Sequence, residues 1–280
     1  IGNESFERCK NLKNLAFSDD SELNTIENKA FGYSAIETLT IPENLIELKS
    51  GWCENVVDLK NIILSPKNKN FCYLDKDKKI ICGKSDQKKD IFDVIVFASR
   101  DVKQCIIPPT IKIIESNSFE NCRKLKSIQI SEDSQLTKIN QSAFKDSNIT
   151  EIFIPKNVES IGIAAFEGCR YLKNIYFDEY SILKSIGKTA YGKTNINSLI
   201  FPKSLTKFNL MLVGCFFLKA VEFLAEDISI NFKCFSRSKV VMFSFPNVRK
   251  IEINNAAFNA YYMMKSKSIF INQNAEIILN

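Results

Sequence analysis

Self-similarity along the chain constrains its fold more than any other feature. Segments 4–17, 117–130 and 164–177 (ESFERCKNLKNLAF, NSFENCRKLKSIQI and AAFEGCRYLKNIYF) carry the same kinds of residue at the same offsets. In each, a phenylalanine is followed three residues later by a cysteine, and then by a short run in which apolar and polar residues alternate. A feature that recurs in this way indicates a stacked architecture rather than a single reactive site.

A column of mostly aromatic residues marks the repeat: Phe6, Phe31, Trp52, Phe119, Phe144, Phe166, Tyr191, Leu212, Phe235 and Phe258. The clean spacings in this column alternate between about 25 and about 22 residues, so two types of unit alternate. The longer unit has a cysteine three residues after the aromatic residue. The shorter unit has serine or threonine there and ends its strand with proline, as in ITEIFIPKNVESI (149–161).

Each unit contains a short strand of the form LxxLxL, whose three apolar side chains point inward. A unit of this size cannot bury its apolar side alone, whereas stacked units share a continuous core. Strands that are each reached by a return segment run parallel, about 4.8 Å apart. We therefore predict an α/β repeat fold: a right-handed solenoid with one parallel β-sheet face and short helical or irregular return segments. We expect it to form a single domain over residues 1–280.

An irregular insertion, about residues 66–104, interrupts the repeat. Trp52 and Phe119 lie 67 residues apart, where two units need about 47. Within the insertion, CYLDKDKKIICG (72–83) predicts a β-hairpin with a charged turn at 75–79. Cys72 and Cys82 flank this hairpin, and the sequence leaves open whether they form a disulfide. The segment CIIPPTIKII (105–114) then resumes the shorter unit.

The residue types present exclude most familiar enzyme designs. Histidine is absent, which removes Ser-His-Asp and Cys-His catalytic groups and histidine-ligated zinc. The chain has no glycine motif that would cradle a phosphate. A glycosidase with two carboxylates is formally open, but no repeated geometry marks a pair of acids. We therefore predict no enzyme activity, no catalytic or metal-binding residues and no cofactor.

Charge and hydropathy narrow the range of partners. The net charge of +6 comes from 38 basic and 32 acidic residues that are interspersed along the chain. Mixed signs favour a solvated surface over a nucleic-acid interface. The longest nearly apolar run, residues 210–218, is too short to span a bilayer. We predict no nucleic-acid partner and no membrane span.

Four cysteines occupy one position of the longer unit: Cys9, Cys122, Cys169 and Cys215. A thiol such as Cys169, between Gly168 and Arg170, is either a reactive site or a small apolar plug. In the shorter units the same position holds Ser34, Ser147, Thr194 and Ser238, as expected where a small side chain must fit. We predict a structural role for this cysteine column.

Outward-facing side chains of the strands form columns along the predicted sheet. The outer column contains Ala16, Thr40, Ile63, Ile106, Gln129, Phe153, Tyr176, Ile200, Glu222 and Ser244. Three adjacent members, Phe153, Tyr176 and Ile200, are large and apolar where solvent is expected. A companion column places the polar residues Glu151, Asn174 and Ser198 beside them. We predict that these six residues bind a partner: Glu151, Phe153, Asn174, Tyr176, Ser198 and Ile200. The alternatives are that the aromatic residues only stabilise the sheet, or that they contact a neighbouring solenoid.

The alternating FxxCxxLKxIxI and IPxxVxxI cores resemble the BspA-like leucine-rich repeat family of surface proteins in host-associated bacteria and protist parasites. The resemblance covers essentially the whole chain and implies a leucine-rich-repeat solenoid. It also implies a secreted or surface-associated binding or adhesion module, whose partner is a host extracellular protein or glycan. The other interpretation is a spacer that presents the insertion or a further domain. Because the chain begins at Ile1 without a methionine, we expect a fragment of a longer protein.

Overall fold

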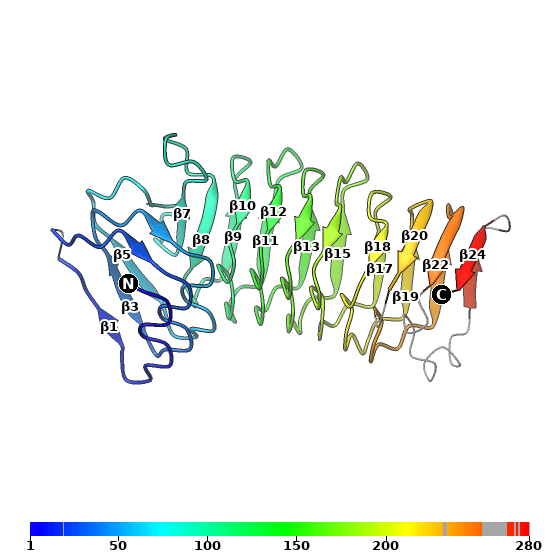
Figure 1. Ribbon diagram of the computed structural model, residues 1–280, viewed down its shortest axis with the longest axis horizontal. Coiled ribbons are helices and arrows are strands. Elements are labelled where there is room, and N and C mark those ends of the chain that lie inside the picture. Colours follow the sequence, from blue (N-terminus) through cyan, green and yellow to red (C-terminus); the bar gives the residue numbers. More distant parts are fainter. Residues whose placement is uncertain (19, 232–233, 254–267, 272, 274, 280) are drawn as a thin grey trace.

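A computed structural model shows an elongated molecule in which short strands stack side by side along the long axis (Figure 1). The structure describes residues 1–18, 20–231, 234–253, 268–271, 273 and 275–279. These residues form 24 strands and no helix, so the α part of the predicted α/β fold and the helical return segments are not confirmed. The column residue Phe258 lies outside the described residues.

The conformation of the return segments explains why they are not helical. In eight turns of the described chain, the residues two positions before and two positions after the column position have positive φ. Around Phe119 these are Asn117 and Asn121, with φ of 60° and 59°. A helix needs consecutive residues in the right-handed region, so alternation with left-handed residues stops it from forming.

The face that we call the front carries parallel strands, most of them four residues long. Their bounds are β1 (Asn14–Leu15), β3 (Thr38–Ile41), β5 (Asn61–Leu64), β9 (Gln104–Ile107), β11 (Ser127–Ile130), β13 (Glu151–Ile154), β15 (Asn174–Phe177), β17 (Ser198–Phe201), β19 (Ala220–Phe223), β21 (Met242–Phe245) and β23 (Ser268–Ile271). They pair in the groups β1-β3-β5, β9-β11, β13-β15 and β17-β19-β21-β23. The predicted parallel face is therefore confirmed, although its hydrogen-bond ladder is interrupted between these groups.

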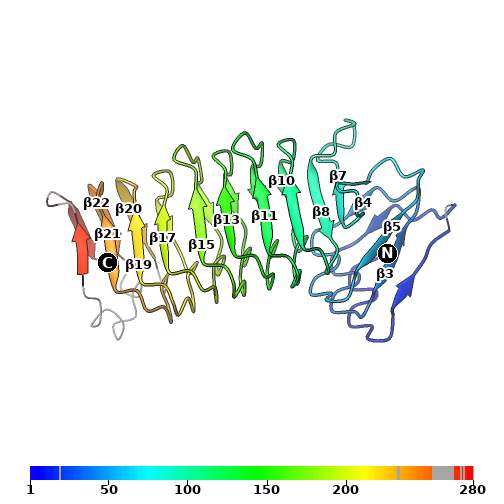
Figure 2. The same cartoon turned by 180° about the vertical axis from the view of Figure 1, so that it is seen from behind.

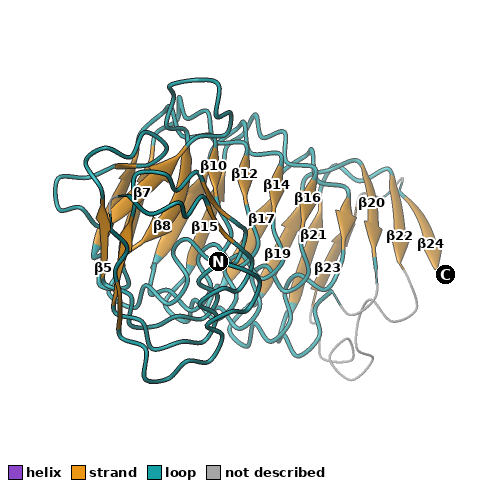
Figure 3. Ribbon diagram, turned by 60° about the vertical axis from the view of Figure 1, so that its left-hand side comes forward, coloured by secondary structure: helices purple, strands orange, loops and turns teal. Residues whose placement is uncertain are grey.

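A second row of parallel strands runs along the back, where the prediction had only return segments (Figures 2 and 3). These strands are β2 (Thr25–Ile26), β4 (Glu47–Leu48), β10 (Ile113–Ile114), β12 (Lys138–Ile139), β14 (Ser160–Ile161), β16 (Ser185–Ile186), β18 (Lys207–Phe208), β20 (Asp227–Ile230), β22 (Lys250–Ile253) and β24 (Glu276–Leu279). Most of them end in a buried isoleucine, such as Ile161. The apolar residue that leads each unit to the next thus pairs with its neighbours as well as packing inward.

The aromatic column forms a stack of rings through the core. Ring centroids lie 4.9 Å apart for Phe119 and Phe144, 5.2 Å for Phe144 and Phe166, and 5.6 Å for Phe166 and Tyr191. These rings are fully buried and nearly parallel, which is a favourable offset-stacked arrangement. Each turn thus contributes one side chain to a continuous core.

The position of Trp52 in this column was predicted one residue too early. The N–H of Phe119 donates to the carbonyl of Ala143, which is the residue before the next column member. The N–H of Phe31 donates in the same way to Trp52, so Cys53 occupies the column position. Trp52 is also buried, and it packs against the ring of Phe97 at 5.8 Å.

The insertion forms the predicted hairpin and one further strand. Strand β6 (Cys72–Tyr73) pairs antiparallel with β7 (Ile80–Gly83), which pairs antiparallel with β8 (Val94–Ala98). Cys72 lies directly opposite Cys82, and both are free thiols. Because β8 also pairs in parallel with β10, the insertion extends the back sheet.

Strand β8 separates two hydrophobic cores, a feature that our sequence interpretation missed. Val94, Val96 and Phe97 pack with the core of the N-terminal turns, whereas Ile95 and Ala98 belong to the core of the long C-terminal stack. All five residues of the strand are buried. The uninterrupted apolar run VIVFA is typical of a strand covered on both faces, so the signal was present in the sequence.

Buried charges tie the N-terminal turns to the rest of the solenoid. Arg100 is buried and donates to the carbonyls of Val56 at 3.0 Å and Ser118 at 3.1 Å. Glu120 is fully buried and accepts from the Asn55 N–H at 2.6 Å. Val56 and Asn55 precede the insertion, while Ser118 and Glu120 follow it. These bonds therefore join the two sides of the insertion where the front ladder is broken.

Candidate functional site

A groove of about 620 Å³ opens on the front face at the ends of β15 and β17. Four of the six predicted binding residues line it, and they are Asn174, Tyr176, Ser198 and Ile200. Glu151 and Phe153 lie one strand away on β13 and do not line the groove. Phe153 is half-buried and pairs in register with Tyr176. The structure thus brings the predicted residues together on one surface, around a hollow that the sequence did not reveal.

The groove exposes large apolar side chains beside polar ones. Tyr176 is 52% exposed and Ile200 is 54% exposed, although both lie on strands of a stacked core. Tyr180, which follows β15, is 71% exposed and also lines the groove. Asn174 and Ser198 supply amide and hydroxyl groups at its side. Rings and an aliphatic side chain bordered by hydrogen-bonding groups can bind a partner by burial and fix its orientation.

The hydrogen-bond ladder of the front face is open at the groove. Strand β17 pairs with β19, and β15 pairs with β13, so no ladder joins β15 to β17. After β15, Asp178 donates its N–H to the carbonyl of Ile154 at 3.1 Å. Pro202 stands at the same position after β17 and has no N–H to donate. The Tyr180 N–H bonds to the Asp178 carboxylate at 2.8 Å, within the turn that borders the groove.

The register of the strands supports the predicted outer column. Thr40 pairs with Ile63, Ile106 with Gln129, and Ile200 with Glu222. Ile106, at 67% exposure, lies on the same face but outside the groove. The column continues to Phe270, which pairs with Ser244 and was not predicted.

Six groove residues escaped the sequence interpretation because they follow the strands rather than form them. They lie in the turns after front strands, and they are Asp178, Glu179, Tyr180, Pro202, Lys203 and Leu224. The available signal was their common offset in successive units, one to three residues beyond the last inward apolar residue.

The cysteine column lies in the core. Cys122, Cys169 and Cys215 are fully buried, and Cys9 is half-buried. The thiol of Cys169 donates to the carbonyl of Phe144 at 3.0 Å, and that of Cys215 donates to Tyr191 at 3.0 Å. Burial raises the pKa of Cys169 to about 12 and that of Cys215 to about 11. A protonated, enclosed thiol is a poor nucleophile, so this column offers no reactive site.

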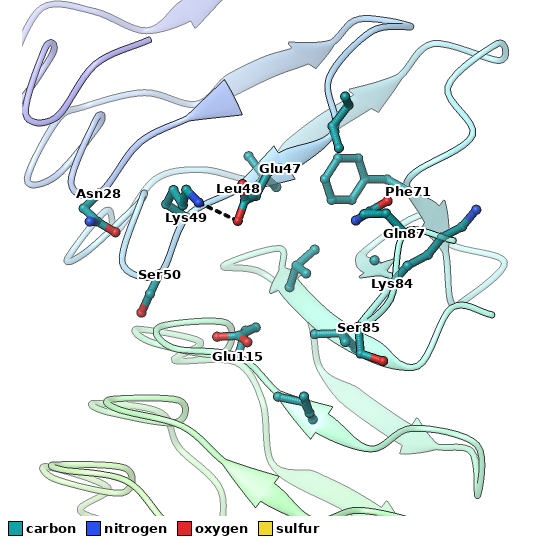
Figure 4. A pocket seen from close by; sticks show the side chains of 15 residues that line it. Asn28, Glu47, Leu48, Lys49, Ser50, Phe71, Lys84, Ser85, Gln87 and Glu115 are labelled. Atoms are coloured by element: carbon teal, nitrogen blue, oxygen red, sulfur yellow. Dashed lines mark hydrogen bonds and ion pairs between the residues drawn. The ribbon is translucent and has the colours of Figure 1, made fainter. Parts of the chain in front are cut away.

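A second cavity of about 570 Å³ lies where the N-terminal turns meet the insertion (Figure 4). One wall carries Glu47 and Lys49, whose side chains are 2.7 Å apart, and the other carries Glu115 and Lys84. Lys84 is held by Asp90 at 2.9 Å. The charged groups of Glu47, Lys49 and Lys84 thus have partners within the chain.

No helix in the described part of the chain is long and apolar enough to cross a membrane.

Comparison with known proteins identifies the repeat. The sequence profile described as a BspA type leucine rich repeat region matches residues 1–74 and 91–216 in six copies. None of the curated proteins matches the chain. Among solved structures, a leucine-rich repeat protein from Eubacterium ventriosum superposes with a TM-score of 0.66 at 21% identity, covering 99% of this chain and 65% of that protein.

The pneumococcal vaccine antigen PcpA superposes with a TM-score of 0.59 at 19% identity. The alignment covers 100% of this chain and 65% of PcpA, so the chain spans less than two thirds of either structure. At these identities the likeness shows the fold. The profile match covers well over half of the chain, and the chain therefore belongs to the BspA type leucine-rich repeat family.

Proposed function

We propose that this chain is a non-enzymatic binding module that engages a protein partner through the groove between β15 and β17. The observation that carries the proposal is the exposure of Tyr176 and Ile200 on the front face. Buried in an interface, each such side chain contributes on the order of 1.5–3 kcal/mol. Large apolar side chains that stay exposed beside polar groups are typical of interaction sites. The sheet needs neither side chain for its core.

We further propose that the module is secreted or displayed at the cell surface and takes part in adhesion. Membership of the BspA type family supports this, as does the similarity to a protein described as a pneumococcal vaccine antigen. The proposed partner is an extracellular protein.

The alternative, a spacer that presents the insertion or a further domain, has less support. A presented hairpin should project from the body and keep few contacts with it. Instead, Ile80 and Cys82 of the hairpin are buried in one core and Ile81 in the other. The hairpin is therefore part of the framework, and the front groove is the better candidate for recognition.

The test compares two variants in a binding screen against extracellular matrix proteins and sulfated glycans at two salt concentrations. The first variant combines Tyr176→Ser and Ile200→Ser. The control is Ile106→Ser, which removes an even more exposed apolar side chain from the same face outside the groove. We expect the double variant to lose at least tenfold in affinity for the captured protein while its circular dichroism stays unchanged. Equal binding by the wild type and both variants would refute the groove as the site.

A further inference from the structure

Acidic residues gather in the turns that follow two front strands of the longer units. These turns, which we call the acidic rim, hold Glu132 and Asp133 after β11, and Asp178 and Glu179 after β15. The shorter units that follow them place Lys156 and Lys203 there. Four carboxylates therefore stand against two ammonium groups, on a chain whose overall charge is +6.

The carboxylates of the rim differ from many others in the chain. Elsewhere, acidic side chains bond to lysines of adjacent turns, as Glu159 does to Lys184 at 2.8 Å and Glu167 to Lys193 at 2.7 Å. Beyond β19, Glu226 likewise pairs with Arg249. Within the described residues, Asp178 and Glu179 form no ion pair. With so many lysines available, these two acids present an uncompensated negative charge.

This charge lies in the groove itself. Asp178 and Glu179 line it together with Tyr176 and Tyr180, while Lys203 lies on the opposite side, after β17. Basic side chains pack against tyrosine rings elsewhere in the chain. Arg8 lies 5.6 Å from the ring centroid of Tyr33, and Lys78 lies 5.6 Å from that of Tyr73. Tyrosine faces beside carboxylates are well suited to hold a cation.

We propose that the occupant of the groove is an extended, basic segment of a partner protein, with a lysine or arginine placed between the tyrosines and Asp178–Glu179. This inference rests on the function proposed above and names the class of partner. Ile200 takes an adjacent apolar side chain of the segment. The charge of the groove is complementary to a basic peptide and repels sulfated glycans.

The geometry of the rim sets the spacing within such a segment. Successive acidic pairs are two turns apart, which is roughly 10 Å for strands stacked about 4.8 Å apart. An extended chain advances about 3.3 Å per residue, so basic residues three positions apart reach two neighbouring pairs. The partner segment that fits runs along the axis of the solenoid and has the pattern basic-x-x-basic. One apolar residue between the basic ones meets Ile200.

The test is a selection of random twelve-residue peptides, displayed on phage, against the immobilised full chain. We expect the selected peptides to be rich in lysine or arginine at a spacing of three. Their binding should weaken about fivefold to tenfold in the combined variant Asp178→Asn, Glu179→Gln, the loss expected when exposed ion pairs are removed. The matched control, Asp20→Asn with Glu22→Gln, removes two exposed carboxylates at the N-terminal end and should change binding less than twofold.

The outcomes separate this inference from the proposed function. Peptides that depend on Tyr176 and Ile200 but are neutral or acidic would overturn the basic partner and leave the groove as a binding site. Heparin that competes at the groove would also overturn it. If no peptide depends on Tyr176 or Ile200, both proposals fail.

Discussion

Replacing Arg100 with methionine should uncouple the N-terminal turns from the rest of the solenoid. The guanidinium is buried and donates to the carbonyls of Val56, Asn117 and Ser118 at 3.0, 3.3 and 3.1 Å. Among the described residues, no other donor reaches the Val56 carbonyl. The variant therefore leaves the buried Val56 carbonyl without a hydrogen-bond donor. It also removes the positive charge of Arg100 from the surroundings of the buried Glu120.

The magnitude follows from the loss of these hydrogen bonds. A buried acceptor left without a donor costs about 1–3 kcal/mol. Glu120 keeps its ion pair with Lys145, at 3.6 Å, in the variant. We therefore expect the free energy of unfolding of the N-terminal turns to fall by about 1–3 kcal/mol.

The chain provides its own probe for this measurement. Trp52 is the only tryptophan, and it is buried in the N-terminal core. Its fluorescence in urea reports the unfolding of these turns, while far-ultraviolet circular dichroism reports all strands. In the variant, the fluorescence transition should move to lower urea and separate from the main dichroism transition. The control is the variant Arg123→Met, which changes an arginine that is exposed. A fluorescence transition shifted by less than about 1 kcal/mol would refute the role of Arg100 as a junction residue.

Three further predictions concern the core. Burial raises the pKa of Glu120, so its contribution to stability is present below the unfolded pKa and is lost as pH rises through the folded value. Glu120→Gln should thus gain stability relative to wild type as pH rises above the unfolded pKa of this carboxyl, and an equal pH profile would contradict this. Gly162→Ala would place the new Cβ 2.5 Å from the backbone of the preceding turn and should lower the free energy of unfolding in urea by about 1–3 kcal/mol. The control Gly2→Ala, whose Cβ meets no backbone atom, should leave it unchanged. With Ellman's reagent, only the half-buried Cys9 and Cys72 should react before denaturation, and several fast thiols would contradict the buried column.

The repeat itself was predictable because its cause is local. A phenylalanine followed by a small residue and an LxxLxL strand can bury its apolar side only by stacking, and Phe144, Phe166 and Tyr191 stack as expected. The hairpin at 72–83 was predictable for the same reason, since alternating residues flank a charged turn. The outward direction of Tyr176 and Ile200 followed from the period of two in a strand.

Other features depend on how distant segments meet. The second row of strands arises because residues such as Ile161 are held in line with Ile139 and Ile186 by the stack, which two-residue segments do not reveal alone. The groove lies where the ladder is open between β15 and β17, with Pro202 on one side and the turn that carries Tyr180 on the other. The sequence shows both residues, but only the three-dimensional stack places them on either side of one hollow.

Chemical modification of tyrosines tests the proposed recognition most directly. Tyr176 and Tyr180 line the groove, whereas Tyr171 is 58% exposed and does not line it, so one chain contains both reporter and control. N-acetylimidazole is applied to the full chain, with and without a saturating protein partner from the binding screen, and each tyrosine is quantified by mass spectrometry. We expect the partner to protect Tyr176 and Tyr180 severalfold while Tyr171 reacts as before. Unchanged reactivity of Tyr176 in the saturated complex would contradict it.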